Sequence, residues 1–376
     1  VPEITQQLLI GLGLFDRAFI FEQLERGIDR TGAGGIGAAG HFLDRLDELV
    51  AVRGVLRDQR QQREAQLALT EHPSAASTTA DAATATAVDA VSTTSTGTTA
   101  TETAAALPPP AGAGRTVPSP LYGVTVDDVS GLSSITEALS KLSRTPTTRI
   151  VFDEYQPASG YRKATVAINK VSYVMGEILD SQYLTTVNVQ GYLDRTNEYL
   201  STLGDVVDIW EIGNEINGEW LGTNSDVVAK MTGAYDIVKG QGRTTALTLY
   251  YNQDCWSKKS NEMFTWAAAN IPQRMKQGLD YVLVSYYEED CNNLKPDWNA
   301  VFTQLATMFP NSRLGFGEVG TSSASQKAAY LQRYYALKPP VANYVGGYFW
   351  WYFREDMVPY TKALWSTLNE AIAATN

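Results

Sequence analysis

Residues 206–215 read VVDIWEIGNE, an apolar run that ends in small and polar residues. Its Val, Ile and Trp side chains favour a strand, and a helical pattern follows over residues 226–239. Seven other runs of this kind are spaced along residues 121–376, and each alternates with an amphipathic helical pattern. The quoted stretch is therefore one copy of a strand–helix unit that occurs eight times.

The eight units predict an α/β fold, a closed barrel of parallel strands inside a ring of helices. Strands that alternate with helices of about 10–15 residues pair in parallel through right-handed crossovers. Eight such units over residues 121–376 match the size of a (β/α)8, or TIM, barrel. An open doubly wound sheet is the alternative, but it would normally carry a phosphate loop after its first strand, where Asp127-Asp128-Val129-Ser130 stands instead. The predicted strands are Tyr122–Asp127, Thr148–Asp153, Tyr173–Leu179, Val206–Ile212, Ala246–Tyr251, Tyr281–Tyr286, Arg313–Glu318 and Val345–Trp351. The predicted helices include Ser134–Leu142, Val187–Leu203, Asp226–Lys239, Met263–Lys276, Pro296–Met308, Ser325–Leu337 and Leu364–Ala374.

The chain before the barrel, which is expected over residues 120–376, has a different composition. Residues 1–71 carry helical patterns and predict a small helical segment, either a weak hairpin or a segment that binds a protein or cell-surface partner. Its Gly-rich run, residues 31–40, has no preceding strand and is interpreted as a linker rather than a phosphate loop. Residues 72–119 are rich in Ala, Thr, Ser and Pro and predict a disordered linker of a type frequent in secreted proteins.

The charge and the histidine content exclude several functions. The formal net charge of −11 disfavours nucleic acid, anionic membranes and strongly acidic polysaccharides as partners. No run of about 18 apolar residues occurs, so no transmembrane segment is expected. The histidines, His41 and His72, both precede the barrel, which excludes Ser-His-Asp and Cys-His sites there and disfavours a zinc site. The chemistry of the barrel must therefore use carboxylates, amides and tyrosines.

Polar side chains cluster where the predicted strands end, which is where barrels of this class carry their active sites. Carboxylates, amides and large aromatic rings suit the hydroxyls and ring faces of sugars better than phosphate. Glu215 and Glu318 end the fourth and seventh strands after small residues, and glycoside cleavage requires such a pair of carboxyl groups. Asp153 and Asn252, at the ends of the second and fifth strands, are further candidates for contacts with a sugar.

This arrangement resembles the large clan A superfamily of retaining glycoside hydrolases, which have (β/α)8 barrels. The resemblance covers residues 121–376 and depends on Asn214-Glu215 after the fourth strand, Glu318 after the seventh and the late Trp350-Trp351 pair. It implies that Glu215 is the acid/base, that Glu318 is the nucleophile and that Asn214 bonds the 2-hydroxyl of the substrate. It implies no metal and no organic cofactor.

The resemblance also implies three residues that support the substrate or the nucleophile. These are an aromatic residue of the sixth strand, Tyr286 or Tyr287, a tryptophan of the eighth strand, Trp350 or Trp351, and an arginine of the second strand, Arg149. Strand alternation favours Trp351 if Gly347 and Phe349 also point inward.

Other acidic residues near these strand ends have simpler interpretations. Glu211 has the inward parity of Glu215 but lies four residues deeper, so it is expected to pair with Arg149 inside the barrel. The Glu288-Glu289-Asp290 run is interpreted as a solvated loop face, with contacts to sugar hydroxyls or to a calcium ion as the alternatives.

The two cysteines, Cys255 and Cys291, follow the fifth and sixth strands at matching distances. Neighbouring strands lie about 4.8 Å apart, so equal register brings the two residues within range of a disulfide. A Cys255–Cys291 bridge is predicted, and with it a secreted or cell-surface protein. Two free thiols in a cytosolic protein are the alternative.

The function predicted from these observations is a retaining glycosidase that acts, in an endo manner, on an oligo- or polysaccharide. A non-catalytic carbohydrate-binding barrel would share the aromatic rim but would tolerate the loss of Glu318. A transglycosylase on the same fold is the other alternative.

Overall fold

The computed structural model describes residues 115–375. The helical segment expected at residues 1–71 lies outside the described residues, as does the expected linker up to residue 114. Residues 115–119, which the composition also assigned to the linker, already belong to the barrel domain. Arg115 donates to both carboxylate oxygens of Asp208, and Val117 is buried among the side chains inside the barrel.

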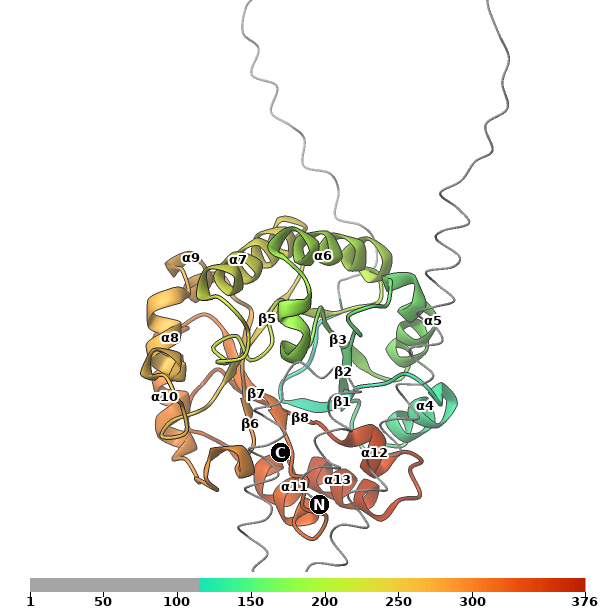
Figure 1. Ribbon diagram of the computed structural model, residues 1–376. Helices are drawn as coiled ribbons and strands as arrows, with labels where there is room; N and C mark the ends of the chain where they lie inside the picture. Colours follow the sequence, from blue (N-terminus) through green and yellow to red (C-terminus); the bar gives the residue numbers. More distant parts are fainter. Residues whose placement is uncertain (1–114, 376) are drawn as a thin grey trace, which may run out of the picture. The chain divides into compact units, whose positions relative to one another are not determined.

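The strands close into a single barrel in which each strand is parallel to both neighbours, in chain order (Figure 1). This confirms the predicted (β/α)8 fold, and an open sheet is ruled out because β8 pairs with β1. The strands are β1 (Leu121–Val126), β2 (Thr147–Val151), β3 (Tyr173–Glu177), β4 (Ile209–Glu211), β5 (Thr245–Tyr250), β6 (Tyr281–Tyr286), β7 (Arg313–Val319) and β8 (Tyr344–Trp350).

Helices form a ring around the barrel, as Figure 1 shows. They are α4 (Leu132–Ser140), α5 (Ala158–Asn169), α6 (Val189–Leu203), α7 (Asn224–Gly240), α8 (Met263–Asn270), α9 (Gln273–Gly278), α10 (Trp298–Met308), α11 (Lys327–Tyr335), α12 (Phe353–Met357) and α13 (Ala363–Ala374). Three short 3-10 helices lie in loops: η1 (Ser181–Thr186), η2 (Lys259–Asn261) and η3 (Glu289–Cys291). None of the helices in residues 115–375 has the length and hydropathy needed to cross a bilayer.

One predicted helix is wrong in a way that proline explains. Residues 263–276 were expected as a single helix, but the structure has α8 and α9 with a break at Ile271-Pro272. Pro272 has no N–H to donate and forces the preceding residue into extended backbone, and Ile271 has ψ 117°. The chain therefore turns between the two helices and starts α9 with Pro272 as its N-cap.

Alternation along the strands divides the barrel core into two layers. One layer lies between the strands and the helices and contains most of the buried hydrophobic residues. The other fills the lower interior of the barrel and includes Leu121, Met175, Ile209, Ala246, Tyr281, Leu283 and Phe349. Above this inner layer the inward positions become polar, beginning with Arg149, Glu177 and Glu211. The inner layer thus forms a hydrophobic floor below a polar mouth.

A β-bulge in β7 determines the direction of Glu318. Leu314 and Phe316 pack in the outer layer, so strict alternation would point Glu318 outward as well. Phe316 pairs with Val284, whereas Glu318 pairs with Ser285, which leaves Gly317 as the extra residue. The bulge turns Glu318 into the barrel. A Cβ atom on Gly317 would lie 2.8 Å from the side chain of Thr248, so only glycine fits there.

We expect Gly317→Ala to lower the free energy of unfolding by about 1–3 kcal/mol, because the added methyl group overpacks the interior beside Thr248. Urea denaturation measures the effect. Gly240→Ala is the matched control, since a Cβ atom there meets nothing within 4 Å and alanine is a better helix former. Equal stability of the Gly317→Ala variant and the wild type would contradict the assignment of the bulge.

Candidate active site

Glu318 lies at the centre of the mouth, where two side chains donate to its carboxylate and a third, Arg149, forms an ion pair with it. Arg149 Nη2 is 2.8 Å from Oε1, and Asn214 Nδ2 is 2.9 Å from the same oxygen. The Tyr287 hydroxyl donates to Oε2 at 2.8 Å. Only 4% of Glu318 is exposed, and such a buried carboxylate needs partners of this kind. Burial raises the pKa of Glu318, and the charge of Arg149 and the hydrogen bond from Tyr287 oppose this shift and favour the charged form.

Arg149 is a buried cation beneath the mouth, and it contacts carboxylates from three other strands. Besides Glu318, its Nε is 2.6 Å from Glu211 Oε2 and its Nη2 is 2.9 Å from Glu177 Oε2. The sequence-based prediction of a Glu211–Arg149 pair is therefore confirmed. Arg149 is completely buried, so of the two expected roles, support of the substrate or of the nucleophile, a direct contact with substrate is ruled out. It holds the carboxylates from below instead, and the three acidic neighbours raise its pKa.

Glu177 differs from the other two carboxylates around Arg149, because neither of its oxygens has a hydrogen-bond partner. Burial raises the pKa of Glu177 well above its usual range, and the charge of Arg149 opposes this shift. One guanidinium cannot compensate three buried carboxylates. We therefore expect Glu177 to be the protonated member of the group.

Glu215 receives only neutral donors, in contrast to Glu318. The Ser285 hydroxyl is 2.5 Å from Oε1, and the Ser181 hydroxyl is 2.9 Å from Oε2. Burial, together with the nearby charge of Glu318, raises the pKa of Glu215 to about 8. At neutral pH Glu215 is thus neutral, whereas the ion pair with Arg149 and two hydrogen bonds favour the charged form of Glu318 against the effect of its burial. This is the division of protonation states that general acid catalysis requires.

The backbone at Glu215 has a left-handed conformation, with φ 47°. This region is strained for residues other than glycine, and it occurs mainly where the surroundings impose it. A tight turn follows at once, closed by a 2.7 Å bond from the Gly218 N–H to the Glu215 carbonyl. The turn lets the side chain of Glu215 bend back over the barrel after a very short β4.

The structure distinguishes between the two tryptophans at the end of β8. Trp350 is fully buried in the outer layer, and its indole N–H donates to Asp356. Trp351 is partly exposed, and the guanidinium of Arg149 lies 5.8 Å from its ring centroid. Phe349 belongs to the inner layer, as the alternation argument required. Trp351 is therefore the residue at the mouth, and Trp350 is corrected to a core residue.

A similar correction applies to two other predicted substrate contacts. Tyr286 packs in the outer layer and donates to the Leu294 carbonyl, so only Tyr287 reaches the mouth. Asn252 is buried, with its amide nitrogen bonded to the Asn261 carbonyl and its oxygen to the Met263 N–H. Both polar ends of Asn252 are occupied, so it supports the loop rather than a ligand. Asp153 is exposed at the end of β2, and its contact with substrate stays a prediction.

The acidic run after β6 is buried at its first position only, whereas Glu289 and Asp290 are exposed as predicted for a solvated loop face. Glu288 is buried and accepts from the hydroxyls of Tyr330 and Tyr334 and from Arg333. Glu289 accepts from Thr321 and Ser322 in the loop after β7. In the part of the chain that the structure describes, no group of His, Cys, Asp or Glu side chains is arranged to hold a metal ion.

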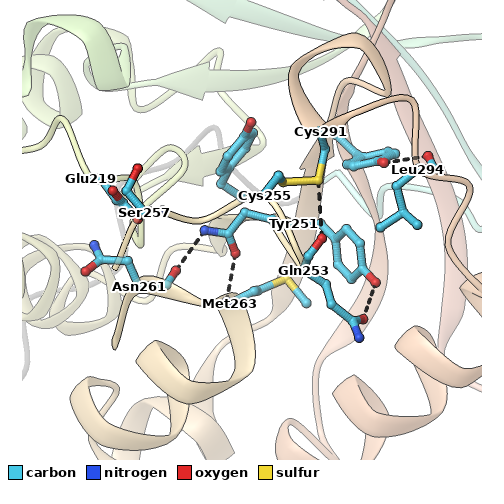
Figure 2. Close-up of a disulfide and its surroundings, with 12 residues drawn as sticks. Glu219, Tyr251, Gln253, Cys255, Ser257, Asn261, Met263, Cys291 and Leu294 are labelled. Atoms are coloured by element: carbon cyan, nitrogen blue, oxygen red, sulfur yellow. Dashed lines mark hydrogen bonds between the residues drawn. A yellow bond between two sulfur atoms is a disulfide. The ribbon is translucent and has the colours of Figure 1, made fainter. Parts of the chain in front are cut away.

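A disulfide connects the loops after β5 and β6, as predicted. Cys255 and Cys291 are bonded, with their Cα atoms 5.1 Å apart (Figure 2). The surrounding loop is further fixed by the Asn252 amide, which bonds the Asn261 carbonyl and the Met263 N–H. The bridge thus braces one side of the mouth.

Sequence reasoning missed Ser181 and Ser285, which bond Glu215, and Glu177, which shares Arg149. Ser285 has the inward parity of Tyr281 and Leu283, so alternation along β6 could have found it. Glu177 ends β3 in the same way that Glu211 ends β4, and the two are paired in register. No pattern in the sequence marks Ser181, which reaches the site from a loop.

No family model matches the sequence, and none of the curated proteins matches it. Among solved structures the chain is similar to Gas2p of Saccharomyces cerevisiae in complex with laminaripentaose, at 11% identity and a TM-score of 0.47. That alignment covers 68% of this chain and 65% of Gas2p, slightly less than two thirds. A GH18 chitinase from Pseudoalteromonas aurantia matches at 11% identity and a TM-score of 0.45, over 67% of this chain and 98% of that one. A GH113 β-1,4-mannanase matches at 11% identity and a TM-score of 0.45, over 68% and 99%. At these identities and scores the similarities carry no conclusion about activity.

The raised pKa of Glu215 predicts how Glu215→Gln changes stability with pH. The folded protein keeps a proton up to about pH 8, whereas the unfolded chain loses it near the ordinary value of 4.5. The wild type therefore loses stability from this group as pH rises from 4.5 to 8, and the Gln variant does not. We expect the free energy of unfolding of the variant, relative to wild type, to increase over that range and to level off above it.

Urea denaturation at several pH values measures this difference. A difference that stays constant between pH 4.5 and 8 would show that Glu215 is not a protonated acid in the folded protein.

Proposed function

We propose that this protein is a retaining glycoside hydrolase in which Glu318 is the nucleophile and Glu215 the acid/base. The proposal is carried by the opposite environments of the two carboxyl groups. Glu318 forms an ion pair with Arg149 and accepts from Asn214 and Tyr287, which favours the anion against the effect of burial, whereas burial and the charge of Glu318 raise the pKa of Glu215 to about 8. Glycoside cleavage needs one group of each kind.

In the first step, a carboxylate oxygen of Glu318 attacks the anomeric carbon and forms an ester bond. The glycosidic C–O bond breaks, and its electron pair goes to the leaving oxygen, which takes the proton of Glu215. The charge of Glu318 disappears in the ester, so the Coulombic cause of the raised pKa of Glu215 is removed. Glu215 is then suited to act as a base.

In the second step, Glu215 takes a proton from water, and the water oxygen attacks the anomeric carbon. The ester bond breaks, its electrons return to Glu318, and the sugar leaves with its original anomeric configuration. Asn214 stands between the two glutamates, since it follows β4 with Glu215 and donates to Glu318 at 2.9 Å. This bridging position supports the short carboxylate separation of a retaining enzyme, roughly 5–5.5 Å, and suits Asn214 to bonding the 2-hydroxyl.

The remaining parts of the proposal concern substrate and location. Trp351, half-buried above Arg149, is suited to stack on the sugar at the cleavage point. Exposed aromatic side chains on the rim, Tyr155, Tyr183 and Trp220, support an open cleft and endo action on a glycan chain. The Cys255–Cys291 disulfide supports a secreted or cell-surface location, because such bonds persist in oxidising compartments.

We expect Glu318→Gln to abolish turnover of a responsive glycan while the variant still folds and binds the glycan. Glu215→Gln should lower kcat/KM by roughly 10²–10⁴-fold, because it removes the proton donor. A screen of neutral polysaccharides with mass detection finds the substrate, and NMR of the first product gives the anomeric configuration. Near-wild-type turnover by Glu318→Gln would contradict the assignment and favour a binding barrel.

The pH dependence of kcat/KM should contain a falling limb near pH 8, because Glu215 loses its catalytic proton there. Glu215→Gln should lack this limb. A substrate whose leaving group is fluoride needs no proton donor, so the limb should also be absent when wild type acts on a glycosyl fluoride. A limb that persists in the Glu215→Gln variant would assign it to another group.

A further inference from the structure

Within residues 115–375, three large hydrophobic side chains are exposed, and all three lie on the rim of the mouth. Tyr155, Tyr183 and Trp220 are 68%, 42% and 37% exposed, and they follow β2, β3 and β4. Trp220 is the nearest of the three to Glu215 in the chain, five residues further along the same loop. An indole ring exposed at the rim of the mouth is suited to contact a ligand, because packing in the core does not account for its exposure.

Trp220 is held in one position by its two neighbours. Its ring meets the ring of Tyr250 edge-on, with centroids 5.3 Å apart and an interplanar angle of 77°. Its other contact is the backbone of Gly218, where a Cβ atom would lie 2.7 Å from Trp220 Cζ2. The indole thus lies against a surface that a larger residue at position 218 would push away, and part of the ring stays open to solvent.

Tyr250 connects this ring to the catalytic carboxyl groups. It ends β5 with the inward parity of Ala246 and Thr248, and it pairs in register with Ser285. Ser285 in turn donates to Glu215. Trp220 and Tyr250 therefore lie on the same side of the mouth as Glu215. Tyr250 is on the strand next to the one that carries Ser285, which is the hydrogen-bond partner of Glu215.

The loops that carry the two rings are braced to each other. Glu219 accepts from the backbone N–H groups of Ser257 and Lys258 in the loop after β5, and Figure 2 shows Glu219 next to Ser257. Asn217 bonds both the N–H and the carbonyl of Tyr250. The Cys255–Cys291 disulfide fixes the same loop to the loop after β6. A binding surface built this way is preorganised and needs no closing lid.

We propose that Trp220, supported by Tyr250, is the platform for the sugar unit on the leaving-group side of the bond that is cleaved, in a neutral glycan. This inference rests on the proposed function. The proton donor must stand beside the glycosidic oxygen, and the far substituent of that oxygen is the departing sugar. Glu318 approaches the anomeric carbon, so the side of the mouth next to Glu215 belongs to the leaving group.

The chemistry around the platform fits neutral sugars. An indole face buries the apolar C–H face of a pyranose ring, and adjacent carboxylates accept from its hydroxyls. Glu219 and Asp290 border the same loops as Lys258 and Lys259, so these local charges offset one another, and the net charge of −11 disfavours a uronic acid or sulfated unit. A sugar that replaces water in the second step enters by the same position, so the platform also serves transfer to an acceptor.

The test compares two kinds of substrate in wild type, Trp220→Ala, Trp220→Phe and Gly218→Ala. The first kind is a neutral hexasaccharide of β-1,3-glucose, β-1,4-glucose or β-1,4-mannose. The second is the disaccharyl fluoride of the same sugar, whose leaving group is a single atom and cannot touch the platform. Thermal unfolding of each variant controls for loss of fold.

We expect Trp220→Ala to lower kcat/KM on the hexasaccharide by about tenfold, the equivalent of about 1.4 kcal/mol. Turnover of the fluoride should stay within about twofold of wild type. Trp220→Phe should restore most of the activity, since it keeps an aromatic face. Gly218→Ala should resemble Trp220→Ala, because the methyl group displaces the indole. With added hexasaccharide as acceptor, Trp220→Ala should also form less transfer product from the fluoride.

Equal losses on both substrates, or no loss on the hexasaccharide, would overturn the platform. Such results would leave the proposed function intact, provided that fluoride turnover disappears in Glu318→Gln. Fluoride turnover that survives in Glu318→Gln, or no turnover of any of these substrates by wild type, would overturn the proposed function and the platform with it.

Discussion

The candidate site depends on one buried cation. Arg149 reaches up from β2 and contacts carboxylates of β3, β4 and β7, so four strands of the barrel meet in a single charge network. No open sheet could bring these strands around one guanidinium, because closure places β2 and β7 across a common interior. Three carboxyl groups share the positive charge of Arg149. Because one cation cannot compensate three buried anions, the three groups do not hold their protons equally strongly. Glu177 has an ion pair with Arg149 but no hydrogen bond, whereas Glu318 has such an ion pair and also accepts two hydrogen bonds.

The difference between Glu215 and Glu318 follows from which donors each can reach. Glu318 lies on the bulge of β7, directly above Arg149, and has an ion pair with it as well as two hydrogen bonds from neutral donors. Glu215 lies after the short β4 and reaches only the hydroxyls of Ser181 and Ser285. Two carboxyl groups in one mouth therefore acquire different roles from backbone geometry alone, without any difference in residue type.

The sequence was sufficient for the fold and for the position of Glu215 and Glu318 at the mouth, and it failed where side-chain direction depends on irregular backbone. The eight-unit pattern predicted all the strands, and β6 was predicted with its observed ends. Alternation alone would have turned Glu318 outward, because the Gly317 bulge leaves no clear pattern. Tyr286 was considered together with Tyr287 because strand parity was not applied beyond the end of β6. Ser181 comes from a loop, and loops have no period from which its direction could be inferred.

Several hydrogen bonds brace the rim of the mouth beside Glu215, a residue with left-handed backbone. Glu215 has φ 47°, and a residue in this region returns to ordinary backbone unless its surroundings hold it. Asn217, two residues later, supplies that restraint: its amide bonds both backbone groups of Tyr250 and also the Asn261 carbonyl. Asn261 donates back to the Asn217 carbonyl, so the turn after β4 is tied to the loop after β5 at several points. The strained conformation at Glu215 is thus stabilised by amide hydrogen bonds that tie its turn to the end of β5 and to the loop that follows.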